Sequence, residues 1–157
     1  MALYPYAGIY KNLLSAYKFK QNKQLSHFLL SKLMEIGSDI ETKINDSLTW
    51  VPVPPRHGKI KQSGWDQIDY LAGKMNQQKN ISVSRCLTRL NTKAQKTLNR
   101  NERLSNLKGQ IICSKKAPRK AIIFDDVITT GATVEACAEA LKKAGTEQVF
   151  AICLFYD

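Results

Sequence analysis

The chain has 157 residues, of which 43% are hydrophobic and 24% are charged, which is ordinary for one globular α/β domain. It has no apolar run close to the roughly 20 residues that span a bilayer, and its start lacks a basic segment followed by an apolar core. We therefore expect a cytoplasmic protein without a membrane span. The net charge of +11 favours an anionic partner, either a polyphosphate ligand or a nucleic acid.

The first part of the chain carries apolar residues at helical spacing. Residues 8–17 and residues 22–36 each show this pattern, and a basic turn joins them. Gly37 follows the second pattern directly and predicts the end of that helix. We therefore expect two amphipathic helices within residues 8–37, followed by a core at residues 48–157. Both parts are expected to form a single domain that covers residues 1–157.

Strand and helix patterns alternate in the next segment. Residues 48–53 form an apolar run that predicts a strand, and two consecutive prolines stop it because proline cannot donate to a sheet ladder. Residues 65–77 carry apolar side chains at helical spacing, with Asp66 as the expected N-cap. Residues 81–90 predict a further strand.

The last part of the chain continues the alternation. Residues 91–109 are polar and basic, and we expect a mobile loop that leads into a short helix at about residues 99–107. A strand follows, then a helix at residues 133–144 that Gly145 ends, and a final strand at residues 148–156. This order predicts an α/β fold with a parallel sheet flanked by helices and a flexible lid loop.

The most informative segment is KAIIFDDVITTGAT at residues 120–133. Its apolar run predicts a buried parallel strand, which places Asp125 and Asp126 at the edge where open α/β sheets bind ligands. Two adjacent carboxylates can accept hydrogen bonds from the vicinal hydroxyls of a ribose. The turn at residues 129–133 offers hydroxyls and backbone N–H groups, and Gly131 allows close approach. A phosphate there would also lie at the positive end of the next helix.

This order of residues resembles the phosphoribosyl pyrophosphate (PRPP) signature of type I phosphoribosyltransferases. The resemblance implies that the chain binds PRPP or a nucleoside monophosphate, with Mg²⁺ carried by PRPP. It also implies that Asp125 and Asp126 bind the ribose and lie close to the positive charge that develops on it as pyrophosphate leaves. The 5′-phosphate is expected at Thr129, Thr130, Gly131, Ala132 and Thr133. A strand with two solvated carboxylates and an N-capped helix would explain single residues but not their order.

The loop after the first predicted core strand carries basic residues. In the same superfamily the loop after an early strand holds the pyrophosphate, and the resemblance places Pro55, Arg56 and His57 there. The planar guanidinium of Arg56 can contact two phosphate oxygens at once. The alternative is a proline-stiffened surface loop with solvated charges.

Residues 88–109 resemble the flexible catalytic loop of glutamine PRPP amidotransferases. Arg89, Lys93 and Lys96 are the expected catalytic cations of this lid, because they would neutralise the departing pyrophosphate together with Mg²⁺. Asp125 and Asp126 complete the predicted catalytic set. No residue stands out as a base that would activate an acceptor, so the acceptor is not identified.

The resemblance is closer to the ComF (competence protein F) family and covers nearly the whole chain. It rests on the catalytic-loop string, on Gly64-Trp65-Asp66-Gln67, and on the pattern of residues 9–20. It implies an accessory role in DNA uptake during competence. Many members begin with a cysteine-rich zinc ribbon. Nothing before Tyr4 provides one, either because it was lost or because this chain starts later, so no role of the ribbon is carried over.

Other functions compete with this hypothesis. A non-catalytic protein could use the same fold to bind single-stranded DNA on its basic face. However, residues 79–120 contain no aromatic side chain on which bases could stack. A third possibility is an allosteric PRPP sensor that lacks turnover. The four cysteines include no Cys-x-x-Cys pair, so we expect neither zinc nor a disulfide.

Overall fold

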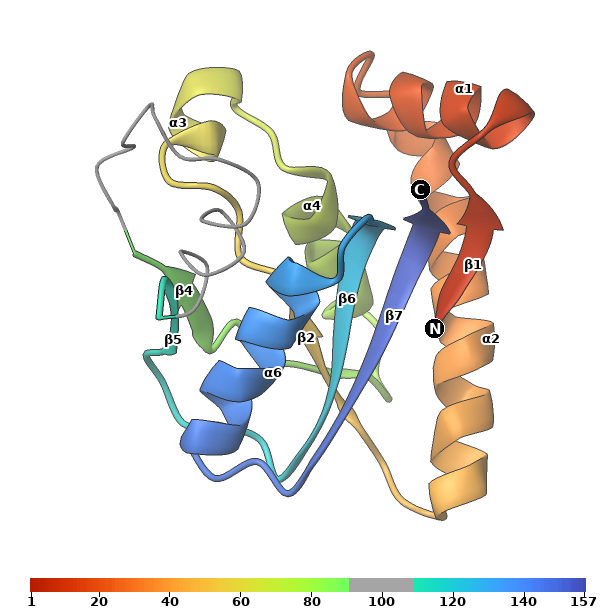
Figure 1. The fold of residues 1–157 in the computed structure, drawn as a ribbon. Helices are drawn as coiled ribbons and strands as arrows, with labels where there is room; N and C mark the ends of the chain where they lie inside the picture. The colour runs from red at the N-terminus through yellow and green to blue at the C-terminus, as the bar shows by residue number, and fades with distance from the viewer. Residues whose placement is uncertain (91–108) are drawn as a thin grey trace.

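The computed structural model describes residues 1–90 and 109–157, and its centre is a five-stranded sheet (Figure 1). The strand order is β1-β7-β6-β2-β3, and every neighbouring pair is parallel. The strands are β1 (Ala2–Pro5), β2 (Thr49–Pro52), β3 (Ser82–Val83), β6 (Lys120–Ile128) and β7 (Gln148–Tyr156). The predicted α/β fold with a parallel sheet flanked by helices is confirmed.

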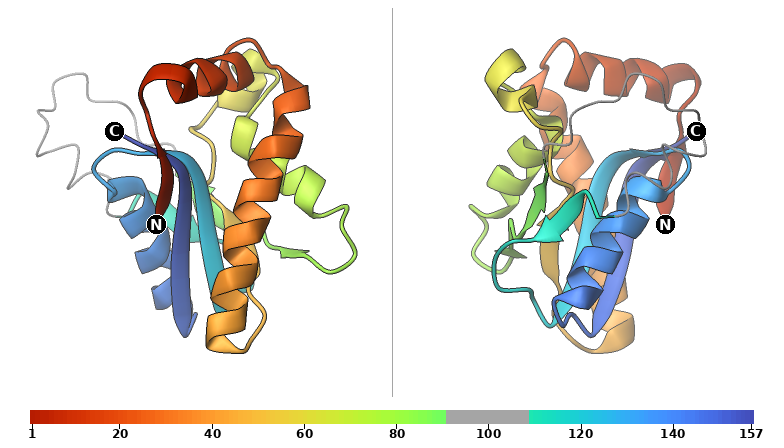
Figure 2. Two further views of the ribbon diagram at one scale, coloured as in Figure 1. Left: turned by 90° about the vertical axis from the view of Figure 1, so that its right-hand side faces the viewer. Right: turned by 60° about the vertical axis from the view of Figure 1, so that its left-hand side comes forward.

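Helices cover both faces of this sheet (Figures 1 and 2). On one face lie α2 (Ser26–Ile44) and α4 (Gln67–Met75), and on the other lies α6 (Ala132–Lys143). Helix α1 (Gly8–Lys18) lies across the carboxyl-terminal edge of the strands, and the short 3₁₀ helix η1 (Lys23–Leu25) connects it to α2. The short helix α3 (Lys59–Ser63) follows β2.

The side chains of β6 alternate between two hydrophobic cores. Ile122 and Phe124 pack with α2 and α4, while Ala121 and Ile123 pack with α6. All four side chains have no exposed surface, as expected for a central strand of a parallel sheet. The α6 core also includes residues of a separate antiparallel pair, β4 (Leu87–Arg89) and β5 (Ile111–Cys113).

The predicted end of the second helix at Gly37 is wrong. Helix α2 continues through this residue to Ile44 and ends at Asn45, which has left-handed backbone angles. Gly37 faces the indole of Trp50 on β2, and a Cβ at this position would collide with that ring. The glycine therefore provides room for helix–sheet packing rather than a helix stop.

The single strand predicted for residues 81–90 is also wrong, because the chain divides it between two sheets. Residues Ser82–Val83 form β3 beside β2, and Leu87–Arg89 form β4 beside β5. Between them Arg85 leaves the sheet and donates from Nε to Asp69 Oδ1 on α4 at 2.7 Å. Strands β1 and β5 and helix α3 were not predicted.

The other predicted elements are close to their observed bounds, and Asp66 caps α4 as expected. The lid prediction for residues 91–109 and the short helix at residues 99–107 fall almost wholly outside the described residues. None of the helices in the described part of the chain is both long enough and apolar enough to cross a membrane.

Candidate functional site

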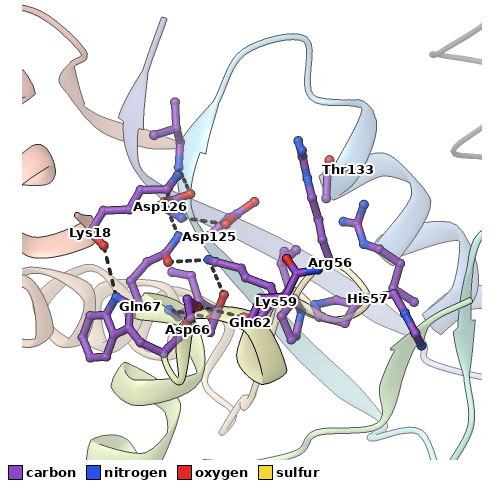
Figure 3. Close-up of a pocket in the computed structure, with 18 of the residues that line it drawn as sticks. Lys18, Arg56, His57, Lys59, Gln62, Asp66, Gln67, Asp125, Asp126 and Thr133 are labelled. Atoms are coloured by element: carbon purple, nitrogen blue, oxygen red, sulfur yellow. Dashed lines mark hydrogen bonds and ion pairs between the residues drawn. The ribbon is translucent and has the colours of Figure 1, made fainter. Parts of the chain in front are cut away.

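A cleft of about 820 Å³ opens at the carboxyl-terminal edge of the sheet, where β2 and β6 end (Figure 3). Its position follows from the strand register, since β2 ends at Pro52, the partner of Phe124, while β6 continues beside β7 to Ile128. The backbone N–H of Val53 still donates to the carbonyl of Phe124 at 3.1 Å. The cleft is lined by the end of α1, the segment after β2, the start of α4, Arg89 and the segment after Phe124.

The two carboxylates of the motif have different surroundings. As neighbours on a strand, Asp125 and Asp126 direct their side chains toward opposite faces of the sheet. Asp126 is only 6% exposed, and its Oδ2 accepts hydrogen bonds from Lys18 Nζ at 2.8 Å and Gln67 Nε2 at 2.6 Å. Burial alone would raise the pKa of Asp126, but the charge of Lys18 and these two hydrogen bonds outweigh burial and lower it.

Asp125 has no such cationic partner among the described residues. Its Oδ1 accepts a hydrogen bond from the backbone N–H of Asp126 at 2.8 Å. Burial raises the pKa of Asp125, and the nearby negative charge of Asp126 raises it further, to about 8. The opposite directions of the two shifts indicate that Asp125 releases its proton at a higher pH than Asp126.

The turn after β6 lies where the sequence predicts a phosphate site. Thr129 and Thr133 line the cleft, and between them Thr130 and Gly131 form the turn and Ala132 begins α6. Gly131 is the N-cap of α6 with φ of 77°, a left-handed conformation that favours glycine. The amino-terminal end of α6, which bears a partial positive charge, therefore lies at this wall of the cleft.

The predicted pyrophosphate loop lies on another wall, because Pro55, Arg56 and His57 all line the cleft. Figure 3 shows Arg56, His57 and Thr133 on the side of Asp125 away from Lys18. A second cavity of about 420 Å³ borders the same loop, and Arg89 lines both spaces.

Of the three predicted catalytic cations of the lid, Arg89 is the one that lies within the described residues. Its Nε is buried and has no hydrogen-bond partner in the described structure. Burial and the charge of Arg56 lower its pKa, while Asp125 acts in the opposite direction. Lys93 and Lys96 lie outside the described residues. The structure thus brings together the motif, the loop at residues 55–57 and Arg89.

The sequence did not predict a site role for Lys18, Gln67 or Lys59. Gln67 connects two lysines, because its Nε2 donates to Asp126 and its Oε1 accepts from Lys59 Nζ at 2.6 Å. Lys59 Nζ also contacts Asp66 Oδ2 at 2.6 Å. The available signals were the string Gly64-Trp65-Asp66-Gln67 and the pattern of residues 9–20, which carry the family resemblance but assign no role to these three side chains.

The same string also fixes the end of α1. Trp65 Nε1 donates to the carbonyl of Lys18 at 3.2 Å, and Tyr17 Oη donates to the carbonyl of Gln67 at 2.8 Å. Asp66 accepts from the backbone N–H groups of Ile68 and Asp69 and so caps α4. Two helices and the motif strand are thereby tied together at one wall of the cleft.

Within residues 1–90 and 109–157, no three His, Cys, Asp or Glu side chains form a group that could hold a metal ion. Side chains with oxygen atoms that line the cleft include Asp125, Thr129 and Thr133.

Sequence comparison finds two similar competence proteins. The chain is 27% identical to competence protein ComFC of Streptococcus pneumoniae over 149 residues, covering 94% of this chain and 64% of that protein. It is 25% identical to competence protein F of Haemophilus influenzae over 147 residues, covering 87% of this chain and 63% of that protein. The chain thus spans less than two thirds of each relative. No family model matches. The predicted resemblance to the ComF family is confirmed.

Proposed function

We propose, from the premise that this is a ComF-like chain, that its cleft binds PRPP with Mg²⁺ and that the protein serves competence-related DNA uptake. The observation that carries the proposal is the convergence of three separate segments. The motif, the loop at residues 55–57 and Arg89 are far apart in sequence but line one cleft. A parallel sheet binds ligands at this edge.

Each part of PRPP has a matching surface. The 5′-phosphate would lie against the turn at residues 129–133, where hydroxyls, N–H groups and the positive end of α6 favour an anion. The diphosphate would lie along Arg56 and His57, with Arg89 as a further cation. The ribose would span the distance between them, beside Asp125.

The two carboxylates would then act differently. Asp125 has no ion-pair partner in the described structure, so its carboxyl group is available to a ribose hydroxyl. Asp126 is already bound by Lys18 and Gln67, so it would contact the sugar only if one of them released it. We assign Asp125 to the ribose and Asp126 to holding Lys18 in the wall of the cleft.

The residues fit an Mg²⁺ ion that arrives with the ligand. Mg²⁺ keeps several waters and binds one or two carboxylates together with substrate phosphates, and Asp125 offers one carboxylate at this place. When bound, the ion would neutralise charge on the diphosphate. Arg56, His57 and Arg89 would orient the diphosphate and stabilise its charge as the bond to the anomeric carbon breaks.

Titration calorimetry with PRPP and MgCl₂, beside a short single-stranded DNA, tests this proposal. We expect saturable PRPP binding and weak DNA binding that falls steeply with added salt. Replacing Arg56 by Ala should weaken PRPP binding by about tenfold or more, since a charge-assisted hydrogen bond contributes roughly 1.5–3 kcal/mol. Arg85→Ala is the matched control, because Arg85 is paired with Asp69 and does not line the cleft.

Tight DNA binding at physiological salt without PRPP binding would contradict the proposal and favour the single-stranded nucleic acid hypothesis. The net charge of +11 is the observation that keeps this second candidate open.

A further inference from the structure

The second cavity, of about 420 Å³, has walls of its own that the cleft does not share. They come from the region of α3 and from β4 and consist of Gly58, Ile60, Lys61, Leu87 and Thr88. The two spaces share only the segment at residues 54–57 and Arg89. The volume lies within the range of small-molecule sites, so this space can hold a ligand separate from one in the cleft.

The charged side chains that line the second cavity have one sign. Arg56, Lys61 and Arg89 line it, and none of its lining residues is Asp or Glu. Among the residues that the structure describes, none of these three cations forms an ion pair with a carboxylate. By contrast, Lys59 of the cleft is paired with Asp66 at 2.6 Å. The second cavity therefore gathers positive charge that attracts an anion.

Arg89 shows the effect of this unbalanced charge on the protein itself. Its side chain is half-buried, and its Nε is buried without a hydrogen-bond partner in the described structure. Burial lowers the pKa of Arg89 and the charge of Arg56 lowers it further, although Asp125 acts in the opposite direction. An oxyanion between the two arginines would relieve their repulsion, because a guanidinium group can contact two oxygens at once.

The other walls of the second cavity are apolar. Pro54, Pro55 and Leu87 line it, and Leu87 is only 7% exposed. Ile60 lines it as well, but this side chain is 45% exposed. An apolar side chain that remains in water at the wall of a cavity gains from being covered by a ligand. A ligand that fits both kinds of wall has an anionic group and an apolar body.

We propose that the second cavity is a separate binding site for a small organic oxyanion, that is, a phosphate or carboxylate group attached to an apolar body. Lys61 holds the oxyanion together with Arg56 and Arg89, and the apolar body lies against Ile60 and Leu87. The inference goes beyond the proposed function, because this site needs neither PRPP nor Mg²⁺. Since both arginines also line the cleft, a ligand here changes the positive charge that is available to a ligand there.

An amide ¹H–¹⁵N NMR titration with phenyl phosphate, without PRPP or metal, tests the site directly. The amides of Lys61 and Thr88 report on the second cavity alone, whereas those of Thr129 and Thr133 report on the cleft alone. We expect saturable shifts at Lys61 and Thr88. Inorganic phosphate should bind there at least about fivefold more weakly, because it has no apolar body to bury. Benzoate is the parallel carboxylate probe, and the tighter of the two aromatic anions identifies the anionic group.

Lys61→Ala should weaken phenyl phosphate binding by about tenfold or more at Thr88, since a hydrogen bond to a charged group contributes roughly 1.5–3 kcal/mol. Any binding followed at Thr133 should stay unchanged within about twofold. Lys116→Ala removes the same charge from an exposed lysine that lines neither space, so it is the matched control. Melting followed by circular dichroism confirms that each variant folds.

Ile60→Ser tests the apolar wall separately and should bring the affinity for phenyl phosphate close to that for inorganic phosphate. The proposal is overturned if neither phenyl phosphate nor benzoate gives saturable shifts at Lys61 and Thr88, or if shifts occur only in the cleft. Equal loss of affinity in Lys61→Ala and Lys116→Ala would also overturn it, because it would reduce the effect to the net charge of the protein. None of these results depends on whether PRPP binds in the cleft.

Discussion

Lys18 Nζ lies 2.8 Å from Asp126 Oδ2, although 108 positions separate the two residues in the sequence. This ion pair connects the end of α1 to the carboxyl end of β6, and Gln67 on α4 donates to the same oxygen at 2.6 Å. One carboxylate of the motif is therefore part of the wall of the cleft, and the other remains available to a ligand.

Replacing Lys18 by Met should lower the free energy of unfolding by about 1–3 kcal/mol, because the buried Asp126 charge then loses its cationic partner. Urea denaturation at pH 7 measures this change. Lys32→Met removes a surface pair with Glu35 at 2.7 Å and should cost at most about 1 kcal/mol. Equal effects of the two substitutions would contradict a structural role for the Lys18–Asp126 pair.

Gln67→Glu should destabilise the protein by about 1–3 kcal/mol, because it replaces a donor to Asp126 with a carboxylate at the same place. Gln67 is 3% exposed, so water cannot substitute for the lost hydrogen bond. Gln62→Glu, the same change at an exposed position, should have little effect. Thermal melting of both variants provides the comparison, and an unchanged melting temperature for Gln67→Glu would show that the network is dispensable.

Asp125 should make stability depend on pH. Its folded-state pKa is about 8, whereas an unfolded chain gives about 3.9. Between these values the folded state binds one more proton, so the free energy of unfolding should decrease as pH rises from about 5 to about 8. Asp126, whose pKa is lowered, loses its contribution only at more acidic pH.

Asn cannot titrate, so Asp125→Asn should flatten this dependence and become increasingly stable relative to the unmodified protein as pH rises. Urea denaturation at several pH values across the window measures both curves. Parallel curves for the two proteins would mean that Asp125 is ionised in the folded state and that its pKa is not raised.

Comparing Gly131→Ala with Gly145→Ala distinguishes an effect of backbone strain on stability from an effect on ligand binding. Both glycines have positive φ, 77° and 97°, and lie at opposite ends of α6. Each substitution should cost roughly 1–2 kcal/mol of stability, because alanine is disfavoured there. Neither new Cβ would make a contact closer than 3.7 Å.

Only Gly131→Ala should also weaken PRPP binding, since its turn borders the cleft. Calorimetric titration of both variants gives this comparison. Equal loss of affinity in the two variants would indicate a general effect of stability and would remove the turn from the proposed phosphate site.

Local patterns predicted much of the fold. The final strand was expected at residues 148–156 and is observed as Gln148–Tyr156, because an apolar run bounded by turn residues specifies it locally. Helix α6 was expected one residue later than Ala132–Lys143 at both ends. The motif position on the sheet edge followed from the alternation of strands and helices.

Tertiary contacts decided the rest. Gly37 has the sequence features of a helix end, and only the approach of Trp50 shows why the helix continues through it. Strand β1 depends on pairing with β7 at the far end of the chain. In the site, Lys18 and Gln67 carry no local signal for contact with Asp126, since each reaches it from a distant helix.

The most direct test of the central claim is an amide ¹H–¹⁵N NMR titration with PRPP and MgCl₂. The account predicts saturable shifts that are largest at residues 129–133, Arg56 and His57. Saturable shifts confined to residues outside the cleft, or no shifts at all while single-stranded DNA produces them, would contradict it.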